Sequence, residues 1–408
     1  MARVLFVLNS ASGGAAVSAR DLMRELRQHG HRCFAVLPPG ASADEMEALR
    51  QVSEEHVTMP LPWWNRKYKA KLWKRPLHWG WNLWRSGGHL GSLLALRRCL
   101  RRWDIELVHT NTSLNLQGAL VAAWSGVPHV WHIREHIGHR RLFRFWLPEP
   151  LLARTFESLS DALVVNSETS AELFRRHHRD RTLRVIYNGV DLDLFAGGAE
   201  ERAPALRKSW GAGEEEPVVA MVAHLSSRVK RHDVFVRAVA QLAPRWPQAR
   251  FVVVGTDPAQ SGGYRSELEH ARAIHDLARE LKVDQRILWA GALDDVPAVM
   301  NAVDLLVHPA DRESFGRVAV EAMAAGKPVV AADAGGLREI VEDGVTGLRV
   351  PAGDADGFAR AIEELLEQPQ RRQALGQAGR RRVEERFSLT ATGRDVDALY
   401  RSLMEAAA

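Results

Sequence analysis

The chain has 408 residues, 46% of them apolar and 26% charged, and a formal net charge of +5. Its length is enough for two domains with full hydrophobic cores, and its composition excludes a fibrous or intrinsically disordered protein. The two cysteines, Cys33 and Cys99, are too few for a disulfide framework or a cysteine-ligated zinc site, and they favour a reducing compartment.

The start of the chain lacks the basic, apolar and small-residue regions of a signal peptide, so we expect a cytoplasmic protein. No window holds eighteen consecutive apolar residues, because Gly, Arg, Trp or His interrupts every candidate. We therefore expect no membrane-spanning helix. Any membrane contact should be peripheral, at the inner face of the cell membrane.

The first half of the chain alternates short β-branched runs with amphipathic stretches. Strands are expected at residues 3–8, 32–37, 107–109, 129–133 and 163–165, with a helix at 15–28. This alternation predicts an α/β domain with a parallel sheet covered by helices.

A basic, tryptophan-rich segment, residues 61–103, interrupts this pattern. It holds eleven Lys and Arg, seven of the 13 tryptophans and no Asp or Glu, so the positive charge of the chain is local. Indole rings favour the bilayer interface and cations favour anionic lipid, so we expect this segment to dock on an anionic membrane surface. The alternative is a solvated basic loop whose tryptophans pack on the first domain. A nucleic-acid partner is not expected, because no nucleic-acid-binding fold is recognised.

The second half repeats the strand–helix alternation, with strands expected at 218–222, 251–254, 287–290, 305–308 and 329–331. Before it, Asn188-Gly189 marks a turn, and the stretch from there to about residue 217 has no sustained period. We expect a first Rossmann-like domain over 1–195 and a second over 205–387. Open α/β sheets bind ligands beyond the carboxyl ends of their strands, so the cleft between two facing sheets should be the active site.

The most informative stretch of the second half is residues 313–331, which joins a loop, a helix and a strand. The loop around Glu313, Ser314 and Phe315 leads into a helix whose first amides and positive dipole end suit a phosphate. Gly316 would let a ligand approach the backbone, and Glu321 could accept both hydroxyls of a ribose. The alternative is a surface helix with two solvated glutamates.

The spacing of this stretch resembles the retaining GT-B glycosyltransferases of family 4, also called glycosyltransferase group 1. Glu313 and Glu321 stand eight residues apart, with Phe-Gly after the first and Ala-Met-Ala-x-Gly-x-Pro-Val-Val after the second. The family's inter-domain element is similar to residues 188–191, and its Lys-Gly-x-Asp segment is similar to Lys230 with Asp233. Gly335-Gly336, Glu339 and residues 344–348 extend the match.

This resemblance implies a nucleotide-sugar donor bound in the second domain and transfer with retention of configuration. Lys230 would meet the charge that develops on the diphosphate, Glu321 would hold the ribose, and Glu313 would hold the sugar. A final helix, about 388–408, would cross back onto the first domain. No residue is evident in the sequence as a covalent nucleophile.

In the first domain the resemblance is looser. Gly13 and Gly14 after the first strand resemble the family's glycine loop, which faces the donor phosphates, although any tight strand-to-helix turn could use them. The family also tends to place a histidine near the end of a strand in this domain. His132 and His136 both fit that description, and His132 is our candidate catalytic residue; the alternative is a histidine satisfied beneath a loop.

The sequence departs from the family where an arginine usually follows the first strand of the second domain. His224 takes that place, with Arg228 nearby, so either residue could supply the second phosphate contact. Asp191-Leu192-Asp193 invites an Asp-x-Asp metal site, but it lies in the hinge element instead of after a strand. With no Cys/His cluster either, we expect neither a metal nor a cofactor.

The sequence as a whole predicts a glycosyltransferase that moves a sugar from a nucleotide-sugar to an acceptor. The basic segment favours a lipid-linked glycan acceptor at the membrane, in polysaccharide or cell-envelope biosynthesis. A GT-B epimerase or phosphorylase is one alternative, and a non-catalytic membrane-surface protein is another. The identities of the sugar, base and acceptor depend on loops that vary within the fold.

Overall fold

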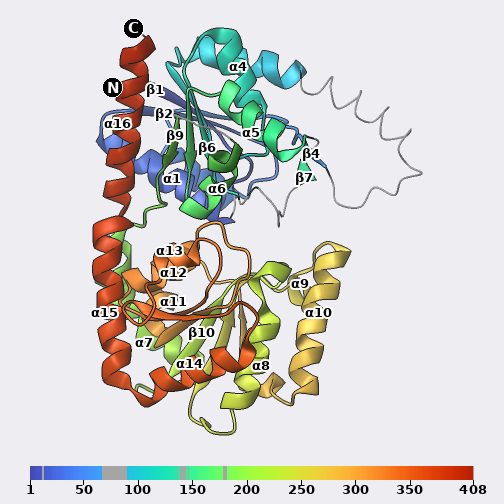
Figure 1. Ribbon diagram of the computed structural model, residues 1–408, viewed down its shortest axis with the longest axis vertical. Coiled ribbons are helices and arrows are strands. Elements are labelled where there is room, and N and C mark those ends of the chain that lie inside the picture. Colours follow the sequence, from blue (N-terminus) through green and yellow to red (C-terminus); the bar gives the residue numbers. More distant parts are fainter. Residues whose placement is uncertain are drawn as a thin grey trace, which may run out of the picture. The chain divides into compact units, whose positions relative to one another are not determined.

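The computed structural model describes residues 1–11, 13–66, 90–135, 137, 144–145, 147–177 and 182–407. The chain divides into two compact units (Figure 1). The first unit comprises Met1–Gly189 and Leu389–Ala408, and the second comprises Val190–Ser388. The chain therefore passes from one unit to the other twice, at Gly189–Val190 and at Ser388–Leu389.

Within the described residues, the first unit is built on a seven-stranded parallel sheet with the strand order β3-β2-β1-β5-β6-β8-β9. The strands are β1 (Arg3–Val7), β2 (Arg32–Leu37), β3 (His56–Thr58), β5 (Leu107–Thr110), β6 (His129–Ile133), β8 (Ala162–Val165) and β9 (Leu183–Val185). A separate antiparallel pair joins β4 (Asn65–Arg66) to β7 (Arg144–Phe145). The helices are α1 (Gly13–Gln28), α2 (Ala43–Arg50), residues 90–102, α4 (Gln117–Ser125), α5 (Glu149–Ser158), α6 (Glu168–His177) and α16 (Leu389–Ala407).

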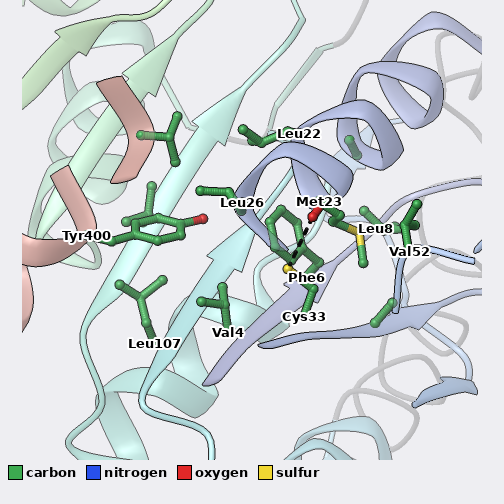
Figure 2. Close-up of a cluster of buried hydrophobic side chains, with 14 of the residues drawn as sticks. Val4, Phe6, Leu8, Leu22, Met23, Leu26, Cys33, Val52, Leu107 and Tyr400 are labelled. Atoms are coloured by element: carbon green, nitrogen blue, oxygen red, sulfur yellow. Dashed lines mark hydrogen bonds between the residues drawn. The ribbon is translucent and has the colours of Figure 1, made fainter. Parts of the chain in front are cut away.

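Alternate residues of β1 enter separate hydrophobic clusters, because successive side chains of a strand point to opposite faces. Val4 and Phe6 pack with residues of α1, whereas Leu5 and Val7 pack with the helix over residues 90–102 and with α4. Figure 2 shows the first of these clusters, with Phe6 beside Met23 and Tyr400 entering from α16. The sheet is thus buried on both faces, as its continuous apolar runs predict.

The last helix, α16, belongs to the first unit. Its Val396 and Tyr400 are fully buried in the same cluster as α1. Asp397 lies 2.8 Å from Nε2 of His31, and the Thr392 hydroxyl donates to the carbonyl oxygen of Tyr187 at 2.9 Å. Apolar burial and these polar contacts together fix the helix on the unit in which the chain begins.

The second unit has a six-stranded parallel sheet with the order β12-β11-β10-β13-β14-β15. Its strands are β10 (Val218–Val222), β11 (Arg250–Val254), β12 (Ile287–Gly291), β13 (Leu305–His308), β14 (Val329–Ala332) and β15 (Gly347–Val350). Its α-helices are α7 (Gly198–Ser209), α8 (His232–Leu242), α9 (Pro258–Ser261), α10 (Arg265–Glu280), α11 (Val296–Ala302), α12 (Arg317–Ala324), α13 (Leu337–Ile340), α14 (Ala355–Glu367) and α15 (Pro369–Arg386). Short 3₁₀ turns are η2 (Leu192–Phe195), η3 (Arg228–Lys230) and η4 (Asp284–Arg286).

The strands expected from the sequence are confirmed in both units, within a residue at either end. The expectation of an irregular connector up to residue 217 is wrong, because α7 occupies 198–209. Ala199 and Ala203 of α7 are buried, and Arg202 forms an ion pair with Asp295 at the start of α11. Tertiary packing stabilises this helix although its sequence has a weak apolar period.

The tryptophans of the basic segment have several fates. Trp103 is buried and stacks on Phe34 with ring centroids 5.2 Å apart, and the Trp64 indole donates to the carbonyl oxygen of Ser113 at 2.7 Å. Trp103 belongs to the core and the half-buried Trp64 packs against it, as the alternative of tryptophans packed on the first domain expected. Trp63 is 40% exposed. Residues 67–89, which hold the other four tryptophans, lie outside the described residues.

Two glycines of α15 allow a matched test of packing. A Cβ added at Gly376 would lie 2.0 Å from the backbone oxygen of Gly326, whereas one added at Gly379 would lie 3.2 Å from the flexible side chain of Met323. Alanine adds the same helix propensity, about 1 kcal/mol, at both positions. We expect Gly376→Ala to lower the free energy of unfolding by about 2 kcal/mol and Gly379→Ala to leave it unchanged or raise it. Urea unfolding measures both, and equal stabilities would contradict this packing.

Candidate active site

The loop that carries Glu313 lies between β13 and α12 and packs directly on the Gly335-Gly336 turn. Gly335 has φ +55°, and a Cβ there would lie 2.2 Å from the carbonyl oxygen of Glu313. A Cβ on Gly336 would lie 2.6 Å from the Ser314 oxygen, and the Gly336 amide donates to the Glu313 oxygen at 2.9 Å. Only glycines permit this contact, so the pair fixes the backbone from which the Glu313 side chain extends.

Gly316 precedes the first residue of α12 and has φ +107°. A Cβ there would lie 2.6 Å from Leu337 of α13, so close packing within the unit is sufficient to require a glycine at this place. The neighbouring Phe315 is buried, and its ring lies 5.9 Å from that of Phe387. Ser314 is half-buried in the same loop.

Lys230 and Glu313 form the central ion pair of the site. The Lys230 Nζ lies 2.5 Å from Oε2 of Glu313, and Nε2 of His308 lies 3.1 Å from the same oxygen. Burial would raise the pKa of Glu313, but the Lys230 ammonium and the His308 imidazole outweigh it and hold that pKa well below its usual range. Glu313 is therefore a carboxylate, and His308 donates to it from Nε2.

The turn that carries Lys230 is fastened to the same loop. Asp311 donates its backbone N–H to the oxygen of Val229 at 3.1 Å. Arg231 has φ +58°, in the left-handed region, where the family's Lys-Gly-x-Asp pattern has glycine. Its guanidinium donates two hydrogen bonds to Asp233, at 2.9 and 2.8 Å, and lies 3.8 Å from Asp311. These charged contacts offset the strain of a non-glycine residue at this position.

Glu321 lies within α12, whose residues 319–324 are all buried. It is 8% exposed, and its Oε1 accepts a hydrogen bond from Nε of Arg317 at 2.7 Å. The alternative of a surface helix with two solvated glutamates is therefore wrong. Glu313 thus lies in the loop before α12 and Glu321 within the helix, each with a basic partner.

His224 and Arg228, the two candidates for a second phosphate contact, lie on the loop and turn after β10. His224 accepts the Thr256 backbone N–H at 3.1 Å through Nδ1, and burial and then Lys230 lower its pKa. Arg228 is exposed. The pKa of His270 on α10 is lowered first by the burial of His270 and then by the charge of Arg228. His224 thus interacts electrostatically with Lys230, whereas Arg228 interacts with His270 of α10.

In the first unit, Gly13 and Gly14 are the first residues of α1. Gly13 has φ +80°, and a Cβ on either glycine would meet no atom within 4 Å, so neither is required by packing. Ser12, which precedes them, lies outside the described residues. The start of this helix is open where the sequence predicts a phosphate-facing loop.

His132 lies at the end of β6 and is fully buried. Its Nδ1 lies 3.4 Å from a guanidinium nitrogen of Arg134, and its ring lies 5.3 Å from that of His109. Burial first, and then Arg134, holds the pKa of His132 well below its usual value. His136, the other candidate, lies outside the described residues.

Sequence reasoning missed three polar side chains of these sites: His308, Arg231 and Arg134. His308 had a signal, because it is a polar residue at the carboxyl end of an otherwise apolar strand. Arg231 and Arg134 had no signal beyond being near a candidate. Asp311, which Arg231 approaches, and Asn111 and Asn188, which Arg134 contacts, stand far away in the sequence.

Asp191 caps η2, because its carboxylate accepts the backbone N–H of Asp193 at 3.2 Å. Across the described parts of the chain, no group of three or more His, Cys, Asp or Glu residues is arranged to hold a metal ion. No helix in those same parts is both long enough and apolar enough to cross a bilayer.

Two Rossmann-like units with parallel sheets, and a lysine and two glutamates around a short helix of the second unit, define a glycosyltransferase of the GT-B fold. Residues 203–382 match the family model for glycosyl transferases group 1, and residues 12–194 match the model for glycosyltransferase family 4. The chain belongs to this family of glycosyltransferases.

Curated relatives agree with this assignment. The D-inositol 3-phosphate glycosyltransferase of Corynebacterium aurimucosum is 33% identical over 306 residues, which cover 74% of this chain and 67% of that protein. The enzyme of the same name from Saccharomonospora viridis is 34% identical over 315 residues, covering 74% and 71%. The fold is similar to that of HepE from Anabaena in complex with UDP, with a TM-score of 0.78 and 24% identity over 98% of this chain and 100% of that one. HepE has also been solved with UDP-glucose.

Removing Lys230 should lower the free energy of unfolding, because the half-buried Glu313 carboxylate then lacks its cation. Because the folded pKa of Glu313 is depressed, the pair stabilises the protein above the ordinary pKa of 4.5, and this stability is lost as the pH falls toward the folded pKa. In Lys230→Met, only His308 opposes the effect of burial, so the pKa of Glu313 should rise from its depressed value and the carboxyl should protonate at a higher pH than in the wild type. We expect a loss of about 3 kcal/mol at neutral pH that shrinks below pH 4.5.

Urea unfolding of the wild type and of Lys230→Met, at neutral pH and below pH 4.5, measures this difference in the free energy of unfolding. The control is Glu313→Gln, in which the same lysine substitution should cost much less at neutral pH because no buried carboxylate remains. A Lys230→Met penalty that is independent of pH and of Glu313 would show that the pair is not coupled.

Proposed function

We propose that this glycosyltransferase takes its sugar from a nucleoside-diphosphate sugar bound at the Lys230–Glu313 pair of the second unit and transfers it with retention of configuration. The half-buried ion pair between Lys230 and the loop before α12 carries this proposal. The complexes of HepE with UDP and UDP-glucose support the class of donor, and the relatives' names support transfer over epimerisation or phosphorolysis.

Cleavage of the donor bond places negative charge on the leaving diphosphate, and Lys230 would stabilise it together with the amides of Ser314, Phe315 and Gly316. The ammonium is held at 2.5 Å by Glu313, so it is positioned before the donor binds. A diphosphate would share this cation with the carboxylate. In this reaction the lysine and the amides do the work of a divalent cation, so no metal or cofactor is proposed.

The two glutamates would hold opposite ends of the donor. Glu313 is a carboxylate with one oxygen committed to Lys230 and His308, and its other oxygen would accept sugar hydroxyls. Glu321 would accept the ribose hydroxyls, with Arg317 orienting its carboxylate at 2.7 Å. His224 or Arg228 would supply a further phosphate contact, and the open N-terminus of α1 at Gly13 and Gly14 has the polarity that favours phosphate.

Kinetics test these roles separately. Lys230→Ala should lower kcat by roughly two to three powers of ten with a small change in donor KM, because the lysine meets charge that develops in the transition state. Glu321→Ala should mainly raise donor KM, because a ribose contact is made in both ground and transition states.

The donor for this assay comes from a panel of nucleotide-sugars, since a ligand of the folded state raises the melting temperature with its concentration. Glu367→Ala, which removes an exposed carboxylate at the end of α14, is the control. Unaltered kinetics in both site variants would refute the proposed roles.

The acceptor is proposed to be a lipid-linked glycan reached at an anionic membrane surface. The helix over residues 90–102 supports this, because Leu90 and Leu94 are 58% and 41% exposed on it and Arg98, Arg101 and Arg102 are exposed further along. Trp124 of α4 is also exposed, and Arg97 stacks on its ring at 4.2 Å. Exposed apolar side chains beside cations suit the interface of an anionic bilayer.

The names of the relatives favour a second candidate, a small polyol phosphate such as inositol phosphate.

Co-sedimentation with liposomes separates these acceptors. We expect binding to vesicles with anionic lipid at low ionic strength, a loss of binding as salt rises, and a clear decrease in Leu94→Glu. Leu194→Glu, at a leucine that is 49% exposed in the second unit, is the matched control and should bind like wild type. Failure of the wild-type protein to bind anionic vesicles at low salt would favour the polyol phosphate.

A further inference from the structure

His132 and Arg134 form a buried polar arrangement at the carboxyl end of β6. The Arg134 guanidinium is held from two other loops, since Nε donates to Asn111 Oδ1 at 2.6 Å and a terminal nitrogen donates to Asn188 Oδ1. The side-chain nitrogen of Asn111 donates in turn to the Ala15 carbonyl at 3.1 Å, which fixes its oxygen toward Arg134. The remaining terminal nitrogen of Arg134 faces Nδ1 of His132 at 3.4 Å.

This contact determines where the proton of His132 lies. A guanidinium has five N–H donors, no acceptor, and does not deprotonate in proteins, so Nδ1 of His132 must be the acceptor. The proton of a neutral imidazole is then on Nε2. An imidazolium would turn its Nδ1–H against the guanidinium in a buried site, and burial together with the charge of Arg134 keeps the ring neutral.

The Nε2 of His132 is a buried donor with no hydrogen-bond partner among the residues that the structure describes. The His132 ring packs against the His109 ring, with centroids 5.3 Å apart. The His109 ring in turn stacks on Phe6, with centroids 4.7 Å apart. The Tyr400 hydroxyl of α16 lies 2.6 Å from Nδ1 of His109. The His132 ring thus has neighbours that fix both its position and its tautomer, while its Nε2–H has no partner in the described part of the chain.

We propose that Arg134 is a positioning residue that fixes His132 as the Nε2–H tautomer, so that His132 donates a hydrogen bond to a substrate oxygen and does not act as a base. The tautomer follows from the contacts of the first unit alone, whereas the substrate contact rests on the proposed glycosyl transfer. The substrate oxygen that accepts this hydrogen bond belongs to a phosphate or to a sugar hydroxyl. Both groups can accept a hydrogen bond, and neither requires that His132 gain a proton.

Long-range ¹⁵N–¹H correlation spectra of ¹⁵N-histidine-labelled enzyme test the tautomer without an activity assay, with His132→Asn assigning the resonance. We expect the Nε2–H pattern in the wild-type protein at about neutral pH. An Nδ1–H pattern or an imidazolium would overturn the proposal, and this measurement needs no variant of Arg134 to fold. In Arg134→Met the single pattern should be lost or averaged, while Arg134→Lys, which keeps a charged donor, should retain more of it. An unchanged spectrum in Arg134→Met would overturn the role of Arg134.

The same spectra identify the substrate oxygen. A shift of the Nε2 resonance on addition of UDP would assign the contact to a phosphate oxygen, and a shift only with UDP-glucose would assign it to a sugar hydroxyl. No shift with either probe, when both are shown to bind, would overturn the donor contact.

Kinetics of two histidine substitutions complete the test. The amide nitrogen of glutamine can take the place of Nε2, whereas that of asparagine takes the place of Nδ1. We expect His132→Asn to lower kcat by about two powers of ten and His132→Gln to lower it by about one or less. Equal large losses would overturn donation from Nε2. Wild-type kinetics in both variants would remove His132 from the proposed reaction, while the spectra would still decide the tautomer.

Discussion

The half-buried pair between Lys230 and Glu313 is the contact on which the geometry of the second unit's site depends. It joins the turn after β10 to the loop before α12 across 83 residues of sequence. Two charges taken out of water cost free energy that their attraction recovers only with good geometry and further hydrogen bonds. The His308 hydrogen bond and the fixed loop backbone supply both. The pair lies where the diphosphate of the proposed donor would contact its cation.

The backbone around the pair is constrained by shape as well as by charge. Gly335, Gly336 and Gly316 sit where a Cβ would collide with the Glu313 loop or with α13. Arg231 solves a related problem differently, since it accepts a left-handed backbone and uses its side chain to hold Asp233 and Asp311. A glycine there would relieve the strain but lose two charged contacts. In this chain the turn that carries Lys230 is therefore stabilised by the Arg231 side chain, although its backbone conformation is strained.

These constraints show what a sequence can and cannot predict. The expected strands were predictable because they are mostly apolar and buried, as at 218–222 and 305–308. The short strands β3, β4, β7, β9 and β15 were not expected from the sequence. The helix α7 was not, because its stability comes from contacts with α11 that no local period records. Glu313, Glu321 and Lys230 were found through the spacing of a family motif. His308 and Arg134 were not, because their importance lies in partners brought close by the fold.

The two units use a basic residue in different ways. In the second unit the partner of Lys230 is a carboxylate, so the cation is neutralised at rest and its attraction can be shared with an incoming phosphate. In the first unit Arg134 meets the neutral oxygens of Asn111 and Asn188 and a neutral imidazole. Its donors are directed by geometry toward those acceptors, and its charge opposes protonation of His132. In the reaction proposed above, one cation would bind a ligand, and the other would determine the protonation state of its neighbour.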